Sequence, residues 1–353
     1  MVNVQNIVKK FNIAGDLVDY FPLGNGHINS TYLVSSSSGN EYVLQKINNY
    51  VFKDVDALMN NYYKVTEFLH NKGIETIRLV KTKDNKIYLK NEDGYFRVYE
   101  FIDNAIWYEK ITDLQMINVA AKSFGKFHKD LKEFDAKDLK EVIPNFHNTK
   151  IRYENLLDAI NEDKMGRVKD CLPEIEFVKS FEDYYGIIVN GIENGTLPLT
   201  VTHNDPKINN VLFDQETGKI RAVIDLDTIM PGSYLFDFGD ALRSLFTGEN
   251  EDCKDLSRLY VRYDVFKAYV KGYLSEMGQV LTQEEKELLP LSVFLLTIEC
   301  GIRFLEDYIR GDVYFKTKTP DHNLIRARTQ LSLAKIIFKK LNHLKAITNK
   351  YAK

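Results

Sequence analysis

The chain has 353 residues, of which 44% are hydrophobic and 27% are charged, and its formal net charge is −3. This composition is typical of a soluble globular protein, and the length allows two domains that each bury a core. The small negative charge excludes a nucleic-acid-binding protein that relies on a broad basic surface, although it allows a local acidic pocket for a cationic substrate.

The sequence carries no signal for a zinc site, for secretion or for a membrane span. The three cysteines, Cys171, Cys253 and Cys300, are widely separated and match no zinc-ligand spacing. The N-terminus lacks an apolar signal segment, and the most apolar stretch, 288–302, is too short to span a bilayer. We therefore expect a cytoplasmic protein with reduced thiols, in which 288–302 is a buried core helix.

The first hundred residues predict six short strands separated by turns, and one helix. The helix covers 54–73, where Leu58, Tyr62, Val65 and Leu69 form an apolar stripe and a glycine is the expected C-cap. The six candidate strands are LVDYFPL, STYLVSS, EYVLQKI, IRLVKT, NKIYLK and GYFRVYEFI.

From about residue 112 the pattern changes to amphipathic helices. Two β-rich runs, NNVLFD and KIRAVIDLD, are joined by the turn QETG and form an island in this helical part. The change of pattern near 101–104 predicts a hinge between two packed lobes. We expect an α+β protein with a lobe of residues 1–102, built on a small, mainly antiparallel sheet, and a mainly helical lobe of residues 103–353.

The loop at 201–214, VTHNDPKINNVLFD, carries the strongest chemical signal. Asp205 and Asn210 are five residues apart in a polar loop directly before a strand. In phosphoryl transfer, an aspartate in such a loop orients the attacking hydroxyl and accepts its proton, and an asparagine five residues on binds Mg²⁺. A solvated polar turn is the simpler interpretation of an isolated His-x-Asp pair, but the full HxDxxxxN pattern is more specific.

The aspartates that follow have different predicted roles. The hairpin between the two β-rich runs returns the chain to Asn210, so Asp225 is expected beside it as a second metal ligand. Asp237 belongs to the tripeptide Asp-Phe-Gly, which holds magnesium in protein kinases. It lies twelve residues beyond Asp225, however, and no predicted hairpin brings it back to Asn210. We expect Asp237 in a loop or a first helical turn, where it caps the helix or braces the catalytic loop.

The segments HNDPKINN and VIDLD together resemble the aminoglycoside phosphotransferase and choline kinase superfamily, whose members are relatives of protein kinases. Within that superfamily the chain resembles the N-acetylhexosamine 1-kinases, and the resemblance extends from about residue 20 to about residue 340. It implies a bilobal, protein-kinase-like fold and an enzyme that transfers the γ-phosphate of ATP to the anomeric hydroxyl of GlcNAc or GalNAc. The segments that resemble those kinases are GNGHINSTYLV, YVLQKIN, THNDPKINNVLFD, AVIDLDTIMPG, FDFGDALR, ECGIRFLEDYIRGDVYFK and HNLIRARTQ.

The resemblance also implies roles for individual polar residues. Asp205 would be the catalytic base and would contact the acceptor, and Asn210 and Asp225 would be the magnesium ligands. Asp227 would be a possible further ligand, directly or through water. Arg303 would contact the sugar hydroxyls, although its acidic neighbours at i−4 and i+4 also suit a surface salt-bridge ladder.

The N-terminal lobe is expected to bind the nucleotide. Gly24 and Gly26 would let the backbone close over phosphates, with an ordinary hairpin turn as the alternative. No GxxxxGK[ST] motif is present, so a Walker-type P-loop is excluded. Lys46, in the strand after the glycines, would contact the phosphates, with a solvated strand lysine as the alternative. Glu100 and Ile102, at the hinge, would bind adenine through main-chain groups.

Several other polar residues have less specific predictions. His27 and Asn29, near the glycines, could reach the acceptor. His128 is expected to pack within a helix, and His203 to hold the catalytic loop by hydrogen bonds. The helix carboxylate that kinases pair with a strand lysine is not evident, because four polar residues share one helix face: Asp56, Asn60, Tyr63 and Glu67.

Two other functions stay open. The first is another small-alcohol kinase of the same superfamily, acting on an aminoglycoside, choline, homoserine or methylthioribose; a cationic acceptor would need carboxylates around the cleft. The second is a nucleotide-binding regulator without catalysis, which the joint presence of Asp205, Asn210, Asp225 and Lys46 disfavours. The expected ligands are therefore ATP, Mg²⁺ and a small sugar, with no nucleic acid and no membrane.

Overall fold

A computed structural model of the chain describes residues 3–24 and 28–352. The chain divides into two compact units. Unit 1 comprises 1–108, 133–143 and 209–231, and unit 2 comprises 109–132, 144–208 and 232–353.

Unit 1 is built on an antiparallel sheet in the order β1–β2–β3–β6–β4, with β5 also paired to β6. All six predicted strands are present, although the runs predicted at 77–82 and 85–90 each keep only two of the predicted residues in a strand, in β4 and β5. A second, three-stranded sheet has the order β10–β9–β7 and contains the predicted hairpin. The strands are β1 (Leu17–Pro22), β2 (Ser30–Ser36), β3 (Glu41–Ile47), β4 (Leu79–Val80), β5 (Leu89–Asn91), β6 (Gly94–Glu100), β7 (Ala105–Ile106), β9 (Val211–Asp214) and β10 (Ile220–Val223).

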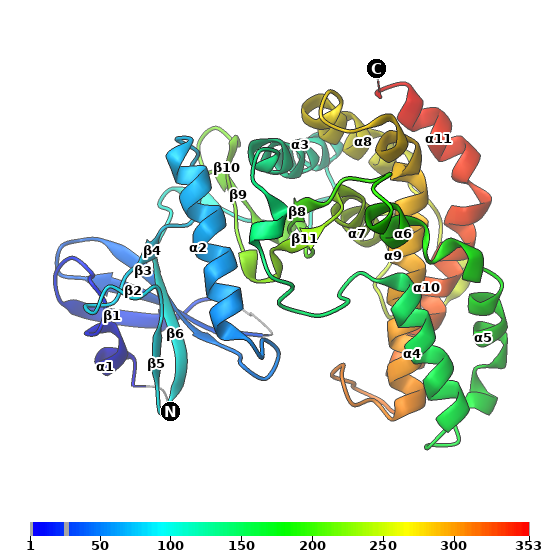
Figure 1. Ribbon diagram of the computed structural model, residues 1–353, viewed down its shortest axis with the longest axis horizontal. Coiled ribbons are helices and arrows are strands. Elements are labelled where there is room, and N and C mark those ends of the chain that lie inside the picture. Colours follow the sequence, from blue (N-terminus) through cyan, green and yellow to red (C-terminus); the bar gives the residue numbers. More distant parts are fainter. Residues whose placement is uncertain (1–2, 25–27, 353) are drawn as a thin grey trace. The chain divides into compact units, whose positions relative to one another are not determined.

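Two helices, α1 and α2, cover opposite faces of the larger sheet (Figure 1). Side chains alternate along a strand, so neighbouring residues face different helices. Leu44 of β3 and Phe96 of β6 pack in the core cluster that includes α1, whereas Gln45 and Arg97 lie on the face toward α2. The helices are α1 (Val4–Val8) and α2 (Val55–Asn71), and short 3-10 helices lie at Ala136–Asp138 and Leu226–Thr228.

The predicted helix 54–73 is confirmed as α2, and local signals explain both of its ends. The side chain of Asp54 accepts a hydrogen bond from the main-chain N–H of Ala57 at 2.9 Å, as an N-cap does. Gly73 has a φ of 71°, in the left-handed region that favours glycine, and its N–H donates to the carbonyl of His70 at 2.9 Å. The helix therefore begins and ends where its capping residues require.

The units differ from the predicted lobes, whose boundary was placed after residue 102. Unit 1 continues to Tyr108 because β7 pairs with β9. Two later segments also belong to it, because Asn61 of α2 donates to the carbonyl oxygens of Lys140 at 2.7 Å and of Ile229 at 3.0 Å. These contacts join residues that are far apart in the sequence, so no local sequence pattern predicts them.

Unit 2 is mainly helical, as predicted, and its core is formed largely by α3, α7, α8, α9 and α10. α9 contains the predicted core stretch 288–302 and begins with a capping box between Thr282 and Glu285. By length and composition α9 could cross a membrane, but 83% of its apolar window is buried inside the protein, as in a core helix.

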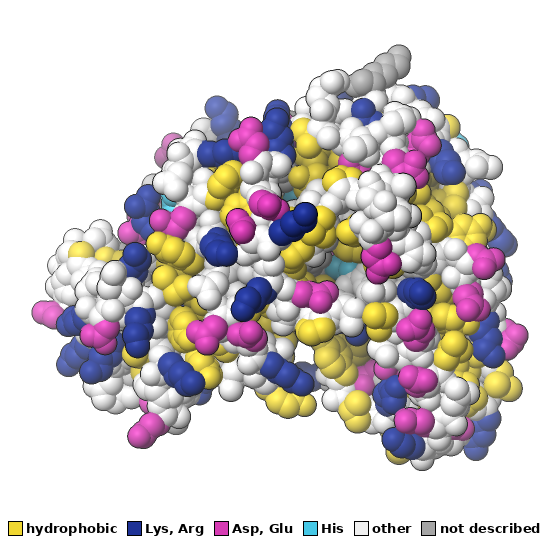
Figure 2. Space-filling view, in the orientation of Figure 1, with side chains coloured by type: hydrophobic (Ala, Val, Ile, Leu, Met, Phe, Trp, Pro, Cys, Tyr) yellow, Lys and Arg dark blue, Asp and Glu magenta, His cyan; other side chains and the backbone are white. Residues whose placement is uncertain are grey.

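The helices of unit 2 are α3 (Leu114–Leu131), α4 (Thr149–Glu162), α5 (Leu172–Lys179), α6 (Ile187–Glu193), α7 (Tyr234–Leu245), α8 (Tyr263–Met277), α9 (Gln283–Arg310), α10 (His322–Lys339) and α11 (Leu341–Asn349). Its 3-10 helices are Val168–Asp170, Glu182–Tyr184 and Leu256–Arg258, and its strand is β8 (Thr200–Thr202). Two short elements span the boundary between the units: the 3-10 helix Ile208–Asn210 and β11 (Met230–Gly232). On the face seen in Figure 2, basic and acidic side chains are interspersed, in keeping with the small net charge.

Candidate active site

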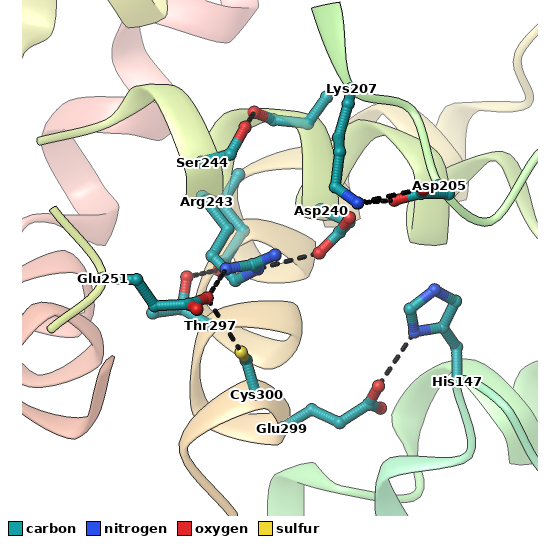
Figure 3. A network of polar contacts seen from close by, with 12 residues as sticks. His147, Asp205, Lys207, Asp240, Arg243, Ser244, Glu251, Thr297, Glu299 and Cys300 are labelled. Atoms are coloured by element: carbon teal, nitrogen blue, oxygen red, sulfur yellow. Dashed lines mark hydrogen bonds and ion pairs between the residues drawn. The ribbon is translucent and has the colours of Figure 1, made fainter. Parts of the chain in front are cut away.

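Asp205 lies in the loop after β8 of unit 2, where it forms an ion pair with Lys207 (Figure 3). The Lys207 Nζ is 2.8 Å from Asp205 Oδ1, and the Asp205 side chain is 28% exposed. Desolvation favours the neutral amine, but the Asp205 carboxylate, helped by that of Asp240, outweighs it and raises the pKa of Lys207. The lysine therefore stays cationic beside the predicted base. It was not among the residues predicted from the sequence, although its position two residues after Asp205 was a usable signal.

Asp237 braces this loop from the first turn of α7, which confirms the structural role predicted for it. Its Oδ2 accepts the main-chain N–H of His203 at 2.7 Å, and its Oδ1 accepts that of Asn204 at 2.6 Å. The side chain is 1% exposed. Burial alone would raise the pKa of Asp237, but the hydrogen bond and charge of His128 outweigh burial and hold it below its ordinary value. The Asp-Phe-Gly aspartate is thus committed to main-chain and histidine donors.

Both predicted structural histidines are packed within unit 2. His128 is fully buried in α3 and contacts Asp237 Oδ2 through Nε2 at 2.7 Å and the Tyr273 hydroxyl through Nδ1 at 2.9 Å. His203 is also buried, and its Nδ1 accepts the main-chain N–H of Asp205 at 3.2 Å. His203 therefore contacts the loop directly and His128 is packed in its helix, as expected, which leaves Asp205 as the candidate base.

A polar network extends from this loop toward α9 (Figure 3). Asp240 accepts a hydrogen bond from Arg243 Nε at 2.8 Å. Glu299 accepts from His147 Nδ1 at 2.8 Å and from the Thr149 hydroxyl at 2.6 Å. Burial would lower the pKa of His147, but the charge of Glu299 outweighs burial and raises it. Each of these two carboxylates is therefore already matched by a cation or donor of its own unit.

Arg303 of α9 does not form the surface salt-bridge ladder that was its alternative interpretation. Glu299, one turn before it, is occupied by the contacts above. Asp307, one turn after it, accepts the main-chain N–H groups of Val313 at 2.9 Å and of Tyr314 at 2.8 Å. The guanidinium of Arg303 lies 5.4 Å from the centre of the Phe146 ring and 5.6 Å from that of Phe315. Within residues 3–24 and 28–352 it has no ion pair, so its donors are available to a ligand.

In unit 1 the predicted hairpin brings Asp225 to Asn210. β9 and β10 pair as expected, and the N–H of Ile224 donates to the carbonyl of Asn210 at 2.9 Å. Asp225 is exposed and has a φ of 59°, a left-handed conformation that is strained for an aspartate. A carboxylate with an amide oxygen suits Mg²⁺, which takes few protein ligands and completes its shell with water and phosphate oxygens. The described residues hold no group of three or more His, Cys, Asp and Glu that could bind a metal ion.

Asp227 is buried and already bound on both oxygens, which limits its predicted role as a further metal ligand. Its Oδ1 forms an ion pair with Arg97 Nη1 at 2.5 Å, and its Oδ2 accepts from Asn29 Nδ2 at 2.6 Å. Asn29, predicted as an acceptor contact, therefore lies in this network of unit 1. Arg97 was not predicted from the sequence, and an arginine inside a strand offers no specific signal.

Lys46 does not join this group, so the geometry does not support the phosphate contact predicted for it. The strand places Lys46 on the α1 face, with its Nζ 5.9 Å from the centre of the Phe96 ring. Gln45, one residue earlier, faces α2 and is bonded to Arg97. Lys46 and Gln45 lie on opposite faces because side chains alternate along a strand, so a shift by one residue moves a side chain to the other face. Of the four candidate helix partners, Asp56 bonds the Tyr88 hydroxyl at 2.5 Å.

The structure describes only some of the other residues that were predicted to bind the nucleotide. Gly24 has a φ of 69°, which favours glycine, whereas Gly26 and His27 lie outside the described residues. Glu100 and Ile102 line a cavity of about 570 Å³ within unit 1. The N–H of Glu100 already donates to the carbonyl of Arg78 at 2.9 Å, but within the described part of the chain the N–H of Ile102 has no main-chain acceptor. Of the two residues predicted to bind adenine, Ile102 is thus the one whose main-chain N–H has no main-chain acceptor in the described residues.

Two sequence comparisons bear on this arrangement. The profile of the phosphotransferase enzyme family (APH) matches residues 19–268, well over half of the chain. An uncharacterized kinase-like protein of Caenorhabditis elegans is 28% identical over 186 residues, which cover 50% of this chain and 46% of that protein. The chain thus matches about half the length of this curated relative.

Solved structures share the whole fold. An aminoglycoside phosphotransferase from Alicyclobacillus acidocaldarius subsp. acidocaldarius is similar with a TM-score of 0.59 and 15% identity, over 99% of this chain and 97% of that one. Amicoumacin kinase hAmiN, solved in complex with AMP-PNP, Ca²⁺ and Ami, has a TM-score of 0.56 and 16% identity, over 90% of this chain and 88% of that one. These likenesses confirm the predicted α+β, protein-kinase-like fold.

Replacing Asp237 by Asn tests its bracing role. Asn presents an N–H₂ group to donors, so at least one buried N–H loses its acceptor, and we expect the free energy of unfolding to fall by about 2–4 kcal/mol. The measurement is urea denaturation at pH 7, with Asp264→Asn in the first turn of α8, an exposed site, as the matched control.

The pH dependence supplies a second check on Asp237. Because its pKa is lowered by folding, its stabilising effect is present above the unfolded pKa of about 3.9 and is lost as the pH falls through the folded value. The stability gap between wild type and Asp237→Asn should therefore be full at pH 7 and shrink below about pH 4. A gap that stayed constant down to pH 2, or a control as unstable as Asp237→Asn, would contradict the assignment.

Proposed function

The chain belongs to the phosphotransferase enzyme family, and we propose that it is a kinase that phosphorylates the anomeric 1-hydroxyl of an N-acetylhexosamine, GlcNAc or GalNAc, with ATP. The observation that carries the choice of acceptor is the guanidinium of Arg303, held over two phenylalanine rings and without an ion pair in the described part of unit 2. The resemblance of the segments around it to N-acetylhexosamine 1-kinases supports the same choice.

The catalytic step is proposed to depend on Asp205. Its carboxylate would orient the sugar 1-hydroxyl and accept the proton that leaves as the oxygen attacks the γ-phosphorus. Lys207, kept cationic by Asp205, would stabilise negative charge on the transferred phosphoryl group. The brace from Asp237 would keep the loop in one conformation, so that little reorganisation is needed at the moment of transfer.

Unit 1 is proposed to hold the nucleotide and its metal. The main chain at Gly24 would approach the phosphates, and the main chain of Ile102 would bind adenine. Asn210 and Asp225 would hold Mg²⁺, which neutralises phosphate charge when bound. The hydrogen bond from the Ile224 N–H to the Asn210 carbonyl supports this proposal, because it holds the residue before Asp225 against Asn210.

The charges around the loop of unit 2 favour a neutral acceptor over a cationic one. A choline or an aminoglycoside requires carboxylates that can face its ammonium groups. Asp205 pairs with Lys207, Asp240 with Arg243 and Glu299 with His147. An ammonium ligand would have to displace one of these partners, whereas Arg303 can donate to the hydroxyl or carbonyl oxygens of a sugar without doing so.

Replacing Asp205 by Asn should lower turnover by about 10³-fold or more, because the variant loses the proton acceptor. The affinity for ATP, measured with a fluorescent analogue, should change less than threefold. Asp214→Asn, at the end of β9, is the control that keeps wild-type turnover. An Asp205→Asn variant with near wild-type turnover would exclude Asp205 as the base.

The acceptor is tested by measuring ATP consumption with GlcNAc, GalNAc, glucose, choline, homoserine and kanamycin. We expect turnover with an N-acetylhexosamine and none with the cationic acceptors. Turnover only with choline, homoserine or kanamycin would replace the proposal by another small-alcohol kinase. Turnover with none of the six, despite ATP binding, would contradict it in favour of a regulator or an untested acceptor.

Replacing Arg303 by Gln should raise the KM for the sugar about tenfold or more and leave the KM for ATP within about twofold, because the lost donors face the acceptor. The matched control is Arg310→Gln in the same helix, where the arginine pairs with Glu306 and Glu162. Equal effects of the two variants on the sugar KM would exclude a special role for Arg303.

A further inference from the structure

We propose that Arg97 and Asp227 form a buried clamp that positions the loop of residues 225–227, and that this clamp replaces a pairing between a strand lysine and a helix carboxylate. The inference rests on the proposed assignment of Asn210 and Asp225 as metal ligands. Arg97 and Asp227 are positioning residues in this scheme and do not touch metal or nucleotide.

Arg97 is placed for this task by the strand that carries it. It lies in the middle of β6, is 1% exposed and forms its ion pair with Asp227 at 2.5 Å. Its Nε and Nη2 both donate to Gln45 Oε1, at 2.8 and 2.6 Å, and its guanidinium lies 4.5 Å from the centre of the Tyr62 ring. The guanidinium is thus fixed by β3 on one side, α2 on another and the carboxylate on a third.

The second oxygen of Asp227 extends the clamp to the segment after the glycine loop. Asn29 Nδ2 donates to Asp227 Oδ2 at 2.6 Å, and Asn29 Oδ1 accepts the main-chain N–H of Asn48 at 2.9 Å. Asn29 directly precedes β2, and Asn48 directly follows β3. One carboxylate therefore ties together the start of β2, the end of β3 and the predicted metal loop.

The loop itself needs such support because Asp225 is strained. A non-glycine residue in the left-handed region costs about 1–3 kcal/mol, and such conformations persist only when their surroundings hold them. Before Asp225, the N–H of Ile224 donates to the carbonyl of Asn210. After it, the carbonyl of Ile229 accepts a hydrogen bond from the Asn61 side chain. The Arg97–Asp227 pair holds the middle of this segment. We infer that it keeps the exposed Asp225 carboxylate in a conformation that can bind a metal.

A double-mutant cycle can separate positioning from plain stability. Removing one partner of a buried ion pair costs about 3–5 kcal/mol, whereas replacing both by apolar residues is often neutral. We therefore expect Arg97→Met and Asp227→Leu to lower the urea midpoint strongly as single variants, and the double variant to recover most of it. A merely structural pair predicts that function recovers together with stability.

The functional readout is the binding of the fluorescent analogue mant-ATP, titrated with Mg²⁺ and in EDTA. In the double variant we expect the gain in affinity that Mg²⁺ gives to fall at least tenfold, while the affinity in EDTA changes less than threefold. The matched control replaces an exposed ion pair of the same unit, with Lys72→Met and Glu133→Leu, and should bind like wild type. A stable double variant with the full Mg²⁺ gain would overturn the proposal.

Two isosteric variants keep the test decisive if the double variant does not fold. Asp227→Asn retains an acceptor for Asn29 but loses the charge. We expect the increase in mant-ATP affinity that Mg²⁺ gives to be at least fivefold smaller in this variant than in wild type, and an increase equal to that of wild type would again overturn the clamp. Asp225→Asn tests the underlying assignment and should abolish the gain. If Asp225→Asn keeps the gain, the proposed metal site itself is wrong, whatever the clamp does.

Discussion

The hydrogen bonds from the main chain of residues 203–204 to Asp237 are the contact on which the rest of unit 2's candidate site depends. Asn204 has a φ of 64°, so the loop turns through a conformation that few residues adopt, and its N–H groups point inward. A buried carboxylate in the first turn of α7 accepts them where the helix dipole also favours negative charge. Asp205 directly follows this fixed turn and forms its ion pair with Lys207.

Unit 1 uses the same principle with different residues. There a buried carboxylate, Asp227, is held by Arg97 and Asn29, and the exposed carboxylate, Asp225, stands two residues away. In both units the aspartate proposed for chemistry is at least partly exposed, and the aspartate that braces its loop is buried. Burial of a charge is costly unless it is paired and fully hydrogen-bonded, so a buried carboxylate with committed partners is suited to support and poorly suited to bind a further ligand.

Sequence spacing predicted the parts of this arrangement that depend on local geometry. The hairpin that brings Asp225 to Asn210 and the helical place of Asp237 both follow from turns and strand lengths that the sequence displays. Lys46 and Gln45 are adjacent polar residues in one strand, and local pattern does not decide which of them faces α2. That choice depends on α1, a five-residue helix with no sequence signal strong enough to predict it. The pairing of Arg97 with Asp227 joins β6 of the larger sheet to the 3-10 helix Leu226–Thr228, and no rule of sequence spacing predicts a contact over that separation.

Arg303 shows how competition between partners decides the role of a charge. The i±4 spacing offered it two carboxylates, and an exposed helix pair would contribute only about 0.3–0.5 kcal/mol. Buried donors compete better, because an unsatisfied buried donor costs about 1–3 kcal/mol. Glu299 therefore binds His147 and Thr149, and Asp307 binds the buried side-chain amide of Asn323. The arginine that loses both carboxylates keeps its hydrogen-bond donors beside two aromatic rings, and this is the arrangement on which the proposed sugar contact rests.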